Sequence, residues 1–327
     1  MDPTDATDAV KPAPTAVVAM GGHAFMQPGE PGTHEDHVAN AKLITRQLMT
    51  LVHRGYRLVI THGNGPQVGN LLLRDEITEV DLGRTPLDVL VAQTEGSLGY
   101  YLQQAMLNEL RMADVRRFVV TVVTQVIVDP ADPAFAAPAK PVGPHLTEEE
   151  ARKREAELNW VVAPHPDGRG WRRQVPSPVP LRVVQRDMIR QAAVRGSIVI
   201  AAGGGGIPIC KDLNDDYVGV EAVIDKDLTS GILATDVGAD LLIILTAVDQ
   251  VWLRFGQPDQ VSLGAVTLAE CERYISEGHF PAGSMGPKVR AIYEFLQRGG
   301  RRALITSASK LNDAMDGKAG THFVGRI

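Results

Sequence analysis

Three lysines lie where the surrounding residues favour a fixed positive charge. Lys226 stands between two carboxylates, Asp225 and Asp227, directly after an apolar run. Lys288 follows a turn rich in glycine and proline, and Lys140 lies in a proline-rich segment that restricts the backbone. An ammonium group can neutralise the oxygens of a phosphoryl group while that group moves between two anions. The pattern favours phosphoryl transfer, with a surface ion pair at Lys226 and a solvated Lys288 as the alternatives.

Glycine-rich turns follow three apolar runs and predict an anion-binding edge. The turns contain Gly21 and Gly22, residues 63–65 and residues 203–206. Glycine lets backbone N–H groups approach an oxyanion closely, and a helix that starts after the turn adds the positive end of its dipole. One such turn is often only a tight bend, but three at one sheet edge favour phosphate binding. None of them has the spacing of a P-loop or of a dinucleotide-binding turn.

Alternating strands and helices must position these segments. Thr33 and Asp36 predict a capping box, and helical periodicity follows it to His53. Further strands are expected at residues 57–61, 118–124, 197–201, 241–246 and 303–306. The alternation predicts an α/β fold with a mainly parallel sheet covered by helices, which binds ligands at the carboxyl ends of its strands.

Two segments interrupt this alternation. Residues 1–14 lack apolar periodicity and are expected to form a disordered tail. Residues 128–180 contain many prolines and show helical periodicity only near residues 147–158. We therefore expect an inserted subdomain at residues 128–180.

Composition excludes several classes of protein. The chain has 327 residues, of which 44% are hydrophobic, so it can form one large domain or two lobes. Its net charge of −6 argues against a nucleic-acid partner, which requires a concentrated positive surface. No apolar run is long enough to cross a bilayer and no secretory signal is visible, so we expect no membrane partner and a cytoplasmic location. Cys210 and Cys271 are expected to be reduced thiols without a chemical role.

Several longer motifs occur in order along the chain. They are residues 17–22, THGNGPQVG at 61–69, residues 124–144 ending in KPVGP, GRGWRRQVPSP at 168–178, GGGGIP at 203–208, VEAVIDKD at 220–227, residues 244–249 and GSMGPK at 283–288. Together these motifs resemble carbamate kinase, a branch of the amino acid kinase family. The resemblance extends from about residue 15 to the carboxyl terminus.

The resemblance implies a fold, a reaction and an assembly. The implied fold is a three-layer αβα sandwich with an open, mainly parallel central sheet and a protruding subdomain. An acceptor lobe would span residues 15–195, with the subdomain at 128–180 as its lid, and a nucleotide-binding lobe would span residues 196–327. The implied reaction transfers a phosphoryl group reversibly between ATP and carbamate, giving ADP and carbamoyl phosphate. Mg²⁺ would be held mainly by the nucleotide phosphates rather than by a protein metal site, and the enzyme would be a homodimer.

Site residues are carried over from the family by motif. The catalytic residues would be Lys140, Lys226, Asp227 and Lys288, with Asp227 orienting two lysines and Lys140 reaching in from the lid. The residues that bind the acceptor would be Gly21, Gly22, His23, Gly63, Asn64, Gly65, Gly204 and Gly205. The residues that bind the nucleotide would be Lys226, Thr246, Asp249, Met285, Gly286 and Lys288. Carbamate is already a nucleophilic anion, so no general base is required, and His62 is expected to fix its turn by hydrogen bonding.

The chain departs from the family's pattern in three places. His23 stands where the family has asparagine, His145 where it has phenylalanine, and residues 183–185 read VVQ instead of IVE. Histidine is larger than asparagine and can gain a proton near neutral pH, so the acceptor could be another small carboxylate. The other interpretations are neutral drift in a carbamate kinase and a nucleotide-binding protein without turnover. The presence of the lysines and Asp227 argues against the last of these.

Overall fold

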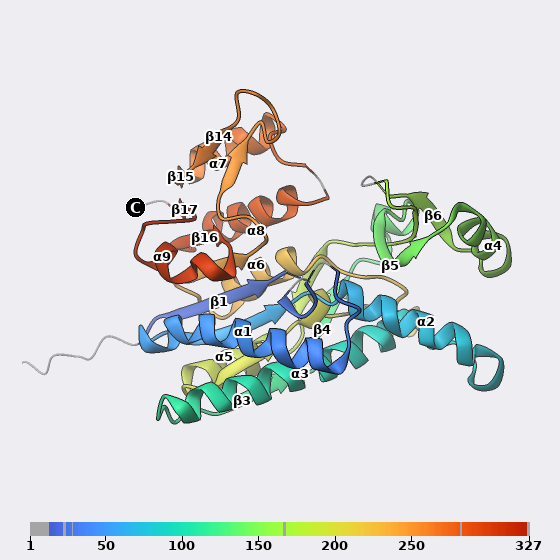
Figure 1. Cartoon of the computed structure of the whole chain (residues 1–327), viewed down its shortest axis with the longest axis horizontal. Helices are drawn as coiled ribbons and strands as arrows, with labels where there is room; N and C mark the ends of the chain where they lie inside the picture. Colours follow the sequence, from blue (N-terminus) through green and yellow to red (C-terminus); the bar gives the residue numbers. More distant parts are fainter. Residues whose placement is uncertain (1–12, 22–23, 28, 166–167, 282, 326–327) are drawn as a thin grey trace, which may run out of the picture.

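An eight-stranded sheet forms the centre of the computed structural model, which describes residues 13–21, 24–27, 29–165, 168–281 and 283–325 (Figure 1). Its strand order is β15-β17-β16-β12-β1-β2-β9-β3. The strands are β1 (Thr15–Met20), β2 (Arg57–His62), β3 (Val119–Val122), β9 (Ile198–Ala201), β12 (Leu241–Leu245), β15 (Ala265–Thr267), β16 (Arg302–Thr306) and β17 (Thr321–Val324). All neighbours are parallel except β16 and β17. The mainly parallel sheet expected from the sequence is confirmed.

Helices cover both faces of this sheet. One layer contains α1 (His34–His53), α3 (Leu87–Met112) and α9 (Leu311–Met315), and the other contains α5 (Arg186–Val194), α6 (Lys226–Asp236) and α8 (Met285–Gln297). Alternate residues of β1 point into different layers: Ala16, Val18 and Met20 pack on the first, Val17 and Ala19 on the second. The three-layer αβα arrangement is therefore confirmed. In the described part of the chain, no helix is long and apolar enough to span a bilayer.

Smaller elements complete the main body. A four-stranded sheet has the order β11-β10-β4-β8, and a two-stranded sheet pairs β13 with β14. Their bounds are β4 (Gln125–Val128), β8 (Pro180–Val183), β10 (Ile207–Lys211), β11 (Tyr217–Gly219), β13 (Val251–Leu253) and β14 (Val261–Leu263), and α7 spans Leu268–Ser276. Helix α2 (Gly65–Leu82) starts at the second glycine turn, with glycine and proline as its first residues. Proline in the first helical turn is nevertheless compatible with a helix, since the N–H groups there have no helical partner.

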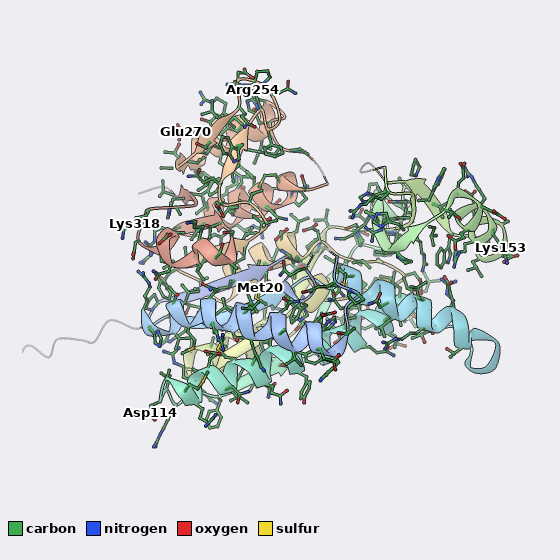
Figure 2. All side chains as sticks on the ribbon, in the orientation of Figure 1. Met20, Asp114, Lys153, Arg254, Glu270 and Lys318 are labelled. Atoms are coloured by element: carbon green, nitrogen blue, oxygen red, sulfur yellow. The ribbon has the colours of Figure 1, made fainter. Side chains whose placement is uncertain are left out.

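The inserted subdomain lies between β4 and β8 in the chain. It contains β5 (Lys140–Leu146), α4 (Glu148–Leu158), β6 (Val161–Pro164) and β7 (Trp171–Val175), with the strand order β5-β7-β6. Leu146, Ala151 and Trp160 form a small core of its own. The subdomain projects from the main body, with Lys153 at its outer end and Met20 near the centre of the molecule (Figures 1 and 2).

Contacts with α2 hold the subdomain against the main body. A β-carbon placed on Gly69 would lie 2.8 Å from Cα of Gly143, so the two backbones touch directly. Nearby, Nη2 of Arg154 lies 2.9 Å from Oε2 of Glu76. These contacts seat β5, and with it Lys140, close to the carboxyl edge of the sheet.

The strand order does not follow the chain order. In the sheet, β9 lies between β2 and β3. In the chain, β2 and β3 come before the subdomain and β9 comes after it. The division into an acceptor lobe and a nucleotide lobe at residue 195 stays a prediction about function.

Candidate active site

A buried carboxylate, Asp227, joins two of the predicted lysines. Its side chain is 4% exposed, and Nζ of Lys288 lies 2.9 Å from Oδ2. Lys226 donates a short hydrogen bond to Oδ1 of the same carboxylate. The structure therefore brings together three of the four residues predicted to be catalytic, from α6 and α8.

The charge of Asp227 and the opposite charges of Lys226 and Lys288 stabilise one another within the cluster. Burial alone would raise the pKa of Asp227, but the ammonium groups of Lys226 and Lys288 outweigh it and lower that pKa. Burial lowers the pKa of Lys226, and Lys288 lowers it further, while Asp227 opposes both effects. Asp227 thus keeps two like charges side by side, where they can neutralise a phosphoryl group.

Both lysines lie in the first turns of their helices. Lys226 is the first residue of α6, which Asp225 caps by accepting a hydrogen bond of 2.9 Å from the Asp227 N–H. Lys288 is the fourth residue of α8. A helix amino end carries partial positive charge, which disfavours lysine there and favours an anion. Two lysines at two such ends indicate an anion site rather than a device for stability.

Lys140 reaches the same region from the subdomain. Its Nζ donates to the Ile224 carbonyl at 3.1 Å and lies 3.5 Å from Oδ2 of Asp225. It contacts the residues just before Lys226 and not Asp227 itself. Lys140 is therefore held at the amino end of α6.

The three glycine turns lie side by side, because β1, β2 and β9 are adjacent and parallel. Three of their N–H groups donate hydrogen bonds within the protein, and the role of these glycines in binding the acceptor stays a prediction. Gly21 donates to the Leu245 carbonyl at 3.1 Å, Gly63 to the Met20 carbonyl at 3.0 Å and Gly205 to the Ala202 carbonyl at 3.1 Å. The sequence could not show this, because the acceptors come from neighbouring strands or from within the turn.

Residues 203–206, here called the glycine loop, pack closely against β2, α3 and α6. A β-carbon on Gly203 would lie 2.5 Å from Cε1 of His62, and one on Gly204 would overlap the Asn64 side chain. Asn64 is itself held by Thr94, since its Nδ2 donates to Oγ1 at 2.8 Å. The structure thus brings Asn64, Gly204 and Gly205 together, and Gly65 follows as the first residue of α2.

His62 lies beneath this loop as a neutral imidazole. Burial lowers its pKa to about 4, and the nearby charge of Lys226 acts in the same direction. Its Nδ1 lies 3.1 Å from the Gly63 carbonyl oxygen, which assigns the proton to Nδ1. This contact fits a role in fixing the turn.

The predicted nucleotide residues lie beyond β12 and at the start of α8. Thr246 follows β12 and donates its N–H to the Thr306 carbonyl at 2.9 Å, and Asp249 is exposed in the next loop. Met285 and Gly286 are the first residues of α8, and the Gly286 N–H donates to the Pro281 carbonyl at 2.9 Å.

Two predicted acceptor residues, Gly22 and His23, lie outside the described residues. His145, the second departure from the family pattern, is an exposed residue of β5. Its ring centroid lies 5.1 Å from that of His165. The contact joins two residues of the subdomain.

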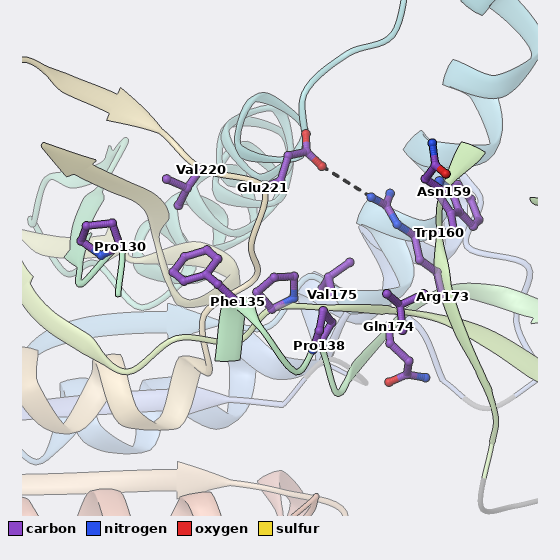
Figure 3. Close-up of a pocket in the computed structure, with 12 residues that line it drawn as sticks. Pro130, Phe135, Pro138, Asn159, Trp160, Arg173, Gln174, Val175, Val220 and Glu221 are labelled. Atoms are coloured by element: carbon purple, nitrogen blue, oxygen red, sulfur yellow. Dashed lines mark hydrogen bonds and ion pairs between the residues drawn. The ribbon is translucent and has the colours of Figure 1, made fainter. Parts of the chain in front are cut away.

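A cavity of about 540 Å³ lies at the base of the subdomain (Figure 3). Its apolar wall includes Phe135, Pro138 and Val175. At its edge, Nη2 of Arg173 lies 3.5 Å from Oε2 of Glu221, as the dashed line in Figure 3 marks. None of the residues that line it is among those predicted to bind substrate, so the chemistry is assigned to the lysine cluster.

Glu95 on α3 was missed by the sequence analysis. It is 1% exposed, and its Oε2 accepts the Thr124 N–H at 2.7 Å directly behind the glycine loop. The sequence held a signal, because Glu95 lies in the apolar stripe of α3 between Val91 and Leu98. An acidic residue within such a stripe is rarely buried without a specific reason.

The family model for the amino acid kinase family matches residues 14–307. The chain belongs to the amino acid kinase family. Members similar to it include carbamate kinase from Pyrococcus horikoshii, 46% identical over 312 residues that cover 93% of this chain and 97% of that protein. Carbamate kinase 2 from Enterococcus faecalis is 43% identical over 307 residues, with coverage of 93% and 97%. The structure of carbamate kinase from Giardia lamblia bound to AMP-PNP has a TM-score of 0.89 and 39% identity, with coverage of 96% of this chain and 99% of that chain.

Proposed function

We propose that this chain is a carbamate kinase, an enzyme that transfers a phosphoryl group reversibly between ATP and carbamate to give ADP and carbamoyl phosphate. The observation that supports the proposal most directly is that Lys226 and Lys288, each in the first turn of a helix, both form ion pairs with Asp227. The relatives at 42–47% identity, which are named carbamate kinases, favour carbamate over another small carboxylate. Since no structural observation supports a different acceptor, we propose none.

The residues of the site would act by charge and position. Carbamate attacks the γ-phosphorus directly, so the O–P bond to ADP breaks as the new O–P bond forms, and no covalent enzyme intermediate is needed. Lys226 and Lys288 would neutralise the transferred oxygens, and Asp227 would hold both ammonium groups in place. Lys140 would close the site from the subdomain.

The acceptor and the nucleotide would occupy different parts of the sheet edge. We assign the acceptor to the ends of β1, β2 and β9, where Gly21, Asn64 and the glycine loop lie. We assign the nucleotide to the region of Thr246, Asp249, Met285 and Gly286. The division therefore follows the predicted lobes at residues 15–195 and 196–327 except at β9 and the glycine loop, which belong to the second lobe in sequence but lie on the acceptor side.

Mg²⁺ would enter as part of the nucleotide substrate. Both oxygens of Asp227 are already engaged by lysines, so this carboxylate does not offer a free ligand position. The phosphates would then hold the ion, which neutralises their charge when bound. Because ATP and ADP are cytoplasmic metabolites, we place the reaction in the cytoplasm.

We also propose that the enzyme is a homodimer. β3 is an edge strand, and beside it the apolar side chains of Tyr100, Leu107, Phe118 and Val123 are 57%, 44%, 80% and 54% exposed. A hollow of about 530 Å³ on this face includes Tyr100, Leu107 and Val123. A second copy of the chain would cover this surface. Sedimentation of the wild-type enzyme and of Leu107→Glu tests it, since only the wild type should dimerise.

The reaction is best tested in the direction of ATP synthesis, with ADP, carbamoyl phosphate and Mg²⁺ in a coupled assay. This direction avoids the instability of free carbamate. Rapid ATP formation is the expected result, and His23→Asn should then leave the kinetics nearly unchanged. A folded protein that binds ADP but makes no ATP would contradict the proposal.

A further inference from the structure

Glu95 contacts the glycine loop from behind. Its carboxyl accepts the Thr124 N–H at 2.7 Å, and the residue is 1% exposed. A β-carbon on Gly203 would lie 3.1 Å from Cγ of Glu95, so the stem of this side chain lies against the loop. The loop therefore rests on a buried acidic side chain.

Thr124, which Glu95 holds, in turn hydrogen-bonds to the residues at both ends of the glycine loop. The Ala202 N–H donates to Oγ1 of Thr124 at 2.9 Å, and the Ile207 N–H donates to the Thr124 carbonyl at 2.8 Å. Ala202 has φ +50°, a left-handed conformation that alanine adopts only when surrounding contacts impose it. By fixing Thr124, Glu95 stabilises the start and the end of the turn.

The same turn of α3 holds a second loop. Thr94 accepts the hydrogen bond from Nδ2 of Asn64 at 2.8 Å, and the Asn64 side chain fills the space beside Gly204. Two consecutive residues of α3 therefore position the two loops to which we assign the acceptor.

The surroundings of Glu95 favour an uncharged carboxyl. It forms no ion pair with any described residue, and its Oε1 accepts no hydrogen bond of ordinary geometry from them, although the Gly203 N–H lies close to the carboxyl. An ionised carboxylate buried without a charged partner is so unfavourable that the group takes up a proton instead. Burial accordingly raises the pKa of Glu95 well above its usual range, although the N–H groups of Thr124 and Gly203 oppose the shift.

We infer that Glu95 is a positioning residue that holds the glycine loop, through Thr124, as an uncharged acid. The inference rests on the proposed function, because it assigns the loop to the acceptor. Glu95 does not touch the lysine cluster, so it acts on the reaction only through the loop.

Kinetics of three variants test the inference. Glu95→Gln keeps the size and an acceptor oxygen, so its kcat and its KM for carbamoyl phosphate should stay within about threefold of wild type. Glu95→Ala should raise the KM for carbamoyl phosphate by at least about tenfold while the KM for ADP changes by less than about threefold. Glu109→Gln, on the same helix, is the matched control. A loss in Glu95→Gln as large as that in Glu95→Ala would overturn the uncharged state, and wild-type kinetics in Glu95→Ala would overturn the positioning role.

Infrared spectroscopy provides a second test that needs no substrate and no Glu95→Ala protein. At neutral pH the wild type should show the carbonyl stretch of a buried protonated carboxyl, and Glu95→Gln should lack it. Absence of this band in the wild type would overturn the inference. Because the spectrum does not depend on turnover, this failure is distinguishable from a failure of the proposed reaction.

Discussion

Lys288 and Asp227 form an ion pair of 2.9 Å that connects the first turn of α8 to the first turn of α6. Lys226 holds the other oxygen of the same carboxylate. One acidic side chain thus sets the separation of two ammonium groups from different helices. The distance between the two ammonium groups therefore depends on Asp227 as much as on the lysines.

Removing the charge of Asp227 should uncouple the lysines. In Asp227→Asn the two ammonium groups face each other without a counter-charge, so we expect kcat to fall by about 100-fold in the coupled assay. Asp259→Asn removes an exposed partner of Arg254 and is the control. An unchanged kcat in Asp227→Asn would show that the lysines do not need the carboxylate.

Each lysine of the cluster should be required for turnover. Lys226→Ala and Lys288→Ala should each reduce kcat/KM by at least about 100-fold without loss of the fold, because each removes charge that stabilises the transition state. Circular dichroism monitors the fold, and Lys153→Ala, on the exposed face of α4, is the matched control. Rates near the wild type would remove that lysine from the proposed mechanism.

Much of this cluster was predictable from the sequence, and its surroundings were not. The chain order places Asp227 beside Lys226, and motif placed Lys288 in the site, so the cluster could be expected. The N–H groups of Gly21 and Gly63 donate to carbonyl groups of neighbouring strands. These partners depend on the order of the strands in the sheet, which the periodicity of the sequence does not reveal. Glu95 could have been noticed as an acid on an apolar helix face, but its contact with Thr124 joins segments far apart in sequence.

Two glycines with nearly the same backbone conformation should differ in their tolerance of a side chain. Gly204 has φ +68° and Gly238 has φ +66°, but a β-carbon meets the Asn64 side chain only at Gly204. Both alanine variants carry the strain of a left-handed residue, on the order of 1 kcal/mol. Gly204→Ala should in addition displace Asn64 and lose most of the activity, whereas Gly238→Ala should keep it. Equal activity in the two variants would contradict the close packing of the glycine loop.

His62 should make the fold sensitive to acid. Its pKa is about 4 in the folded protein, against 6.5 for a solvated histidine, so the folded state binds fewer protons than the unfolded chain between these values. Its contribution to stability is complete above pH 6.5 and is lost as the pH falls towards 4, a loss on the order of 3 kcal/mol. Urea unfolding from pH 7 to pH 4 measures the slope, which should be smaller in His62→Gln and unchanged in the exposed control His53→Gln. Equal slopes in both variants would exclude this role of His62.

The position of β9 in the sheet constrains the order in which the strands can pair during synthesis. β2 and β3 cannot be joined until β9 is inserted between them, and residues 129–179 are synthesised before β9. A nascent chain that ends before residue 201 therefore presents an open strand edge on β2, which is a site for mispairing with other chains. The ribosome must deliver the whole subdomain before the amino-terminal half of the sheet can close.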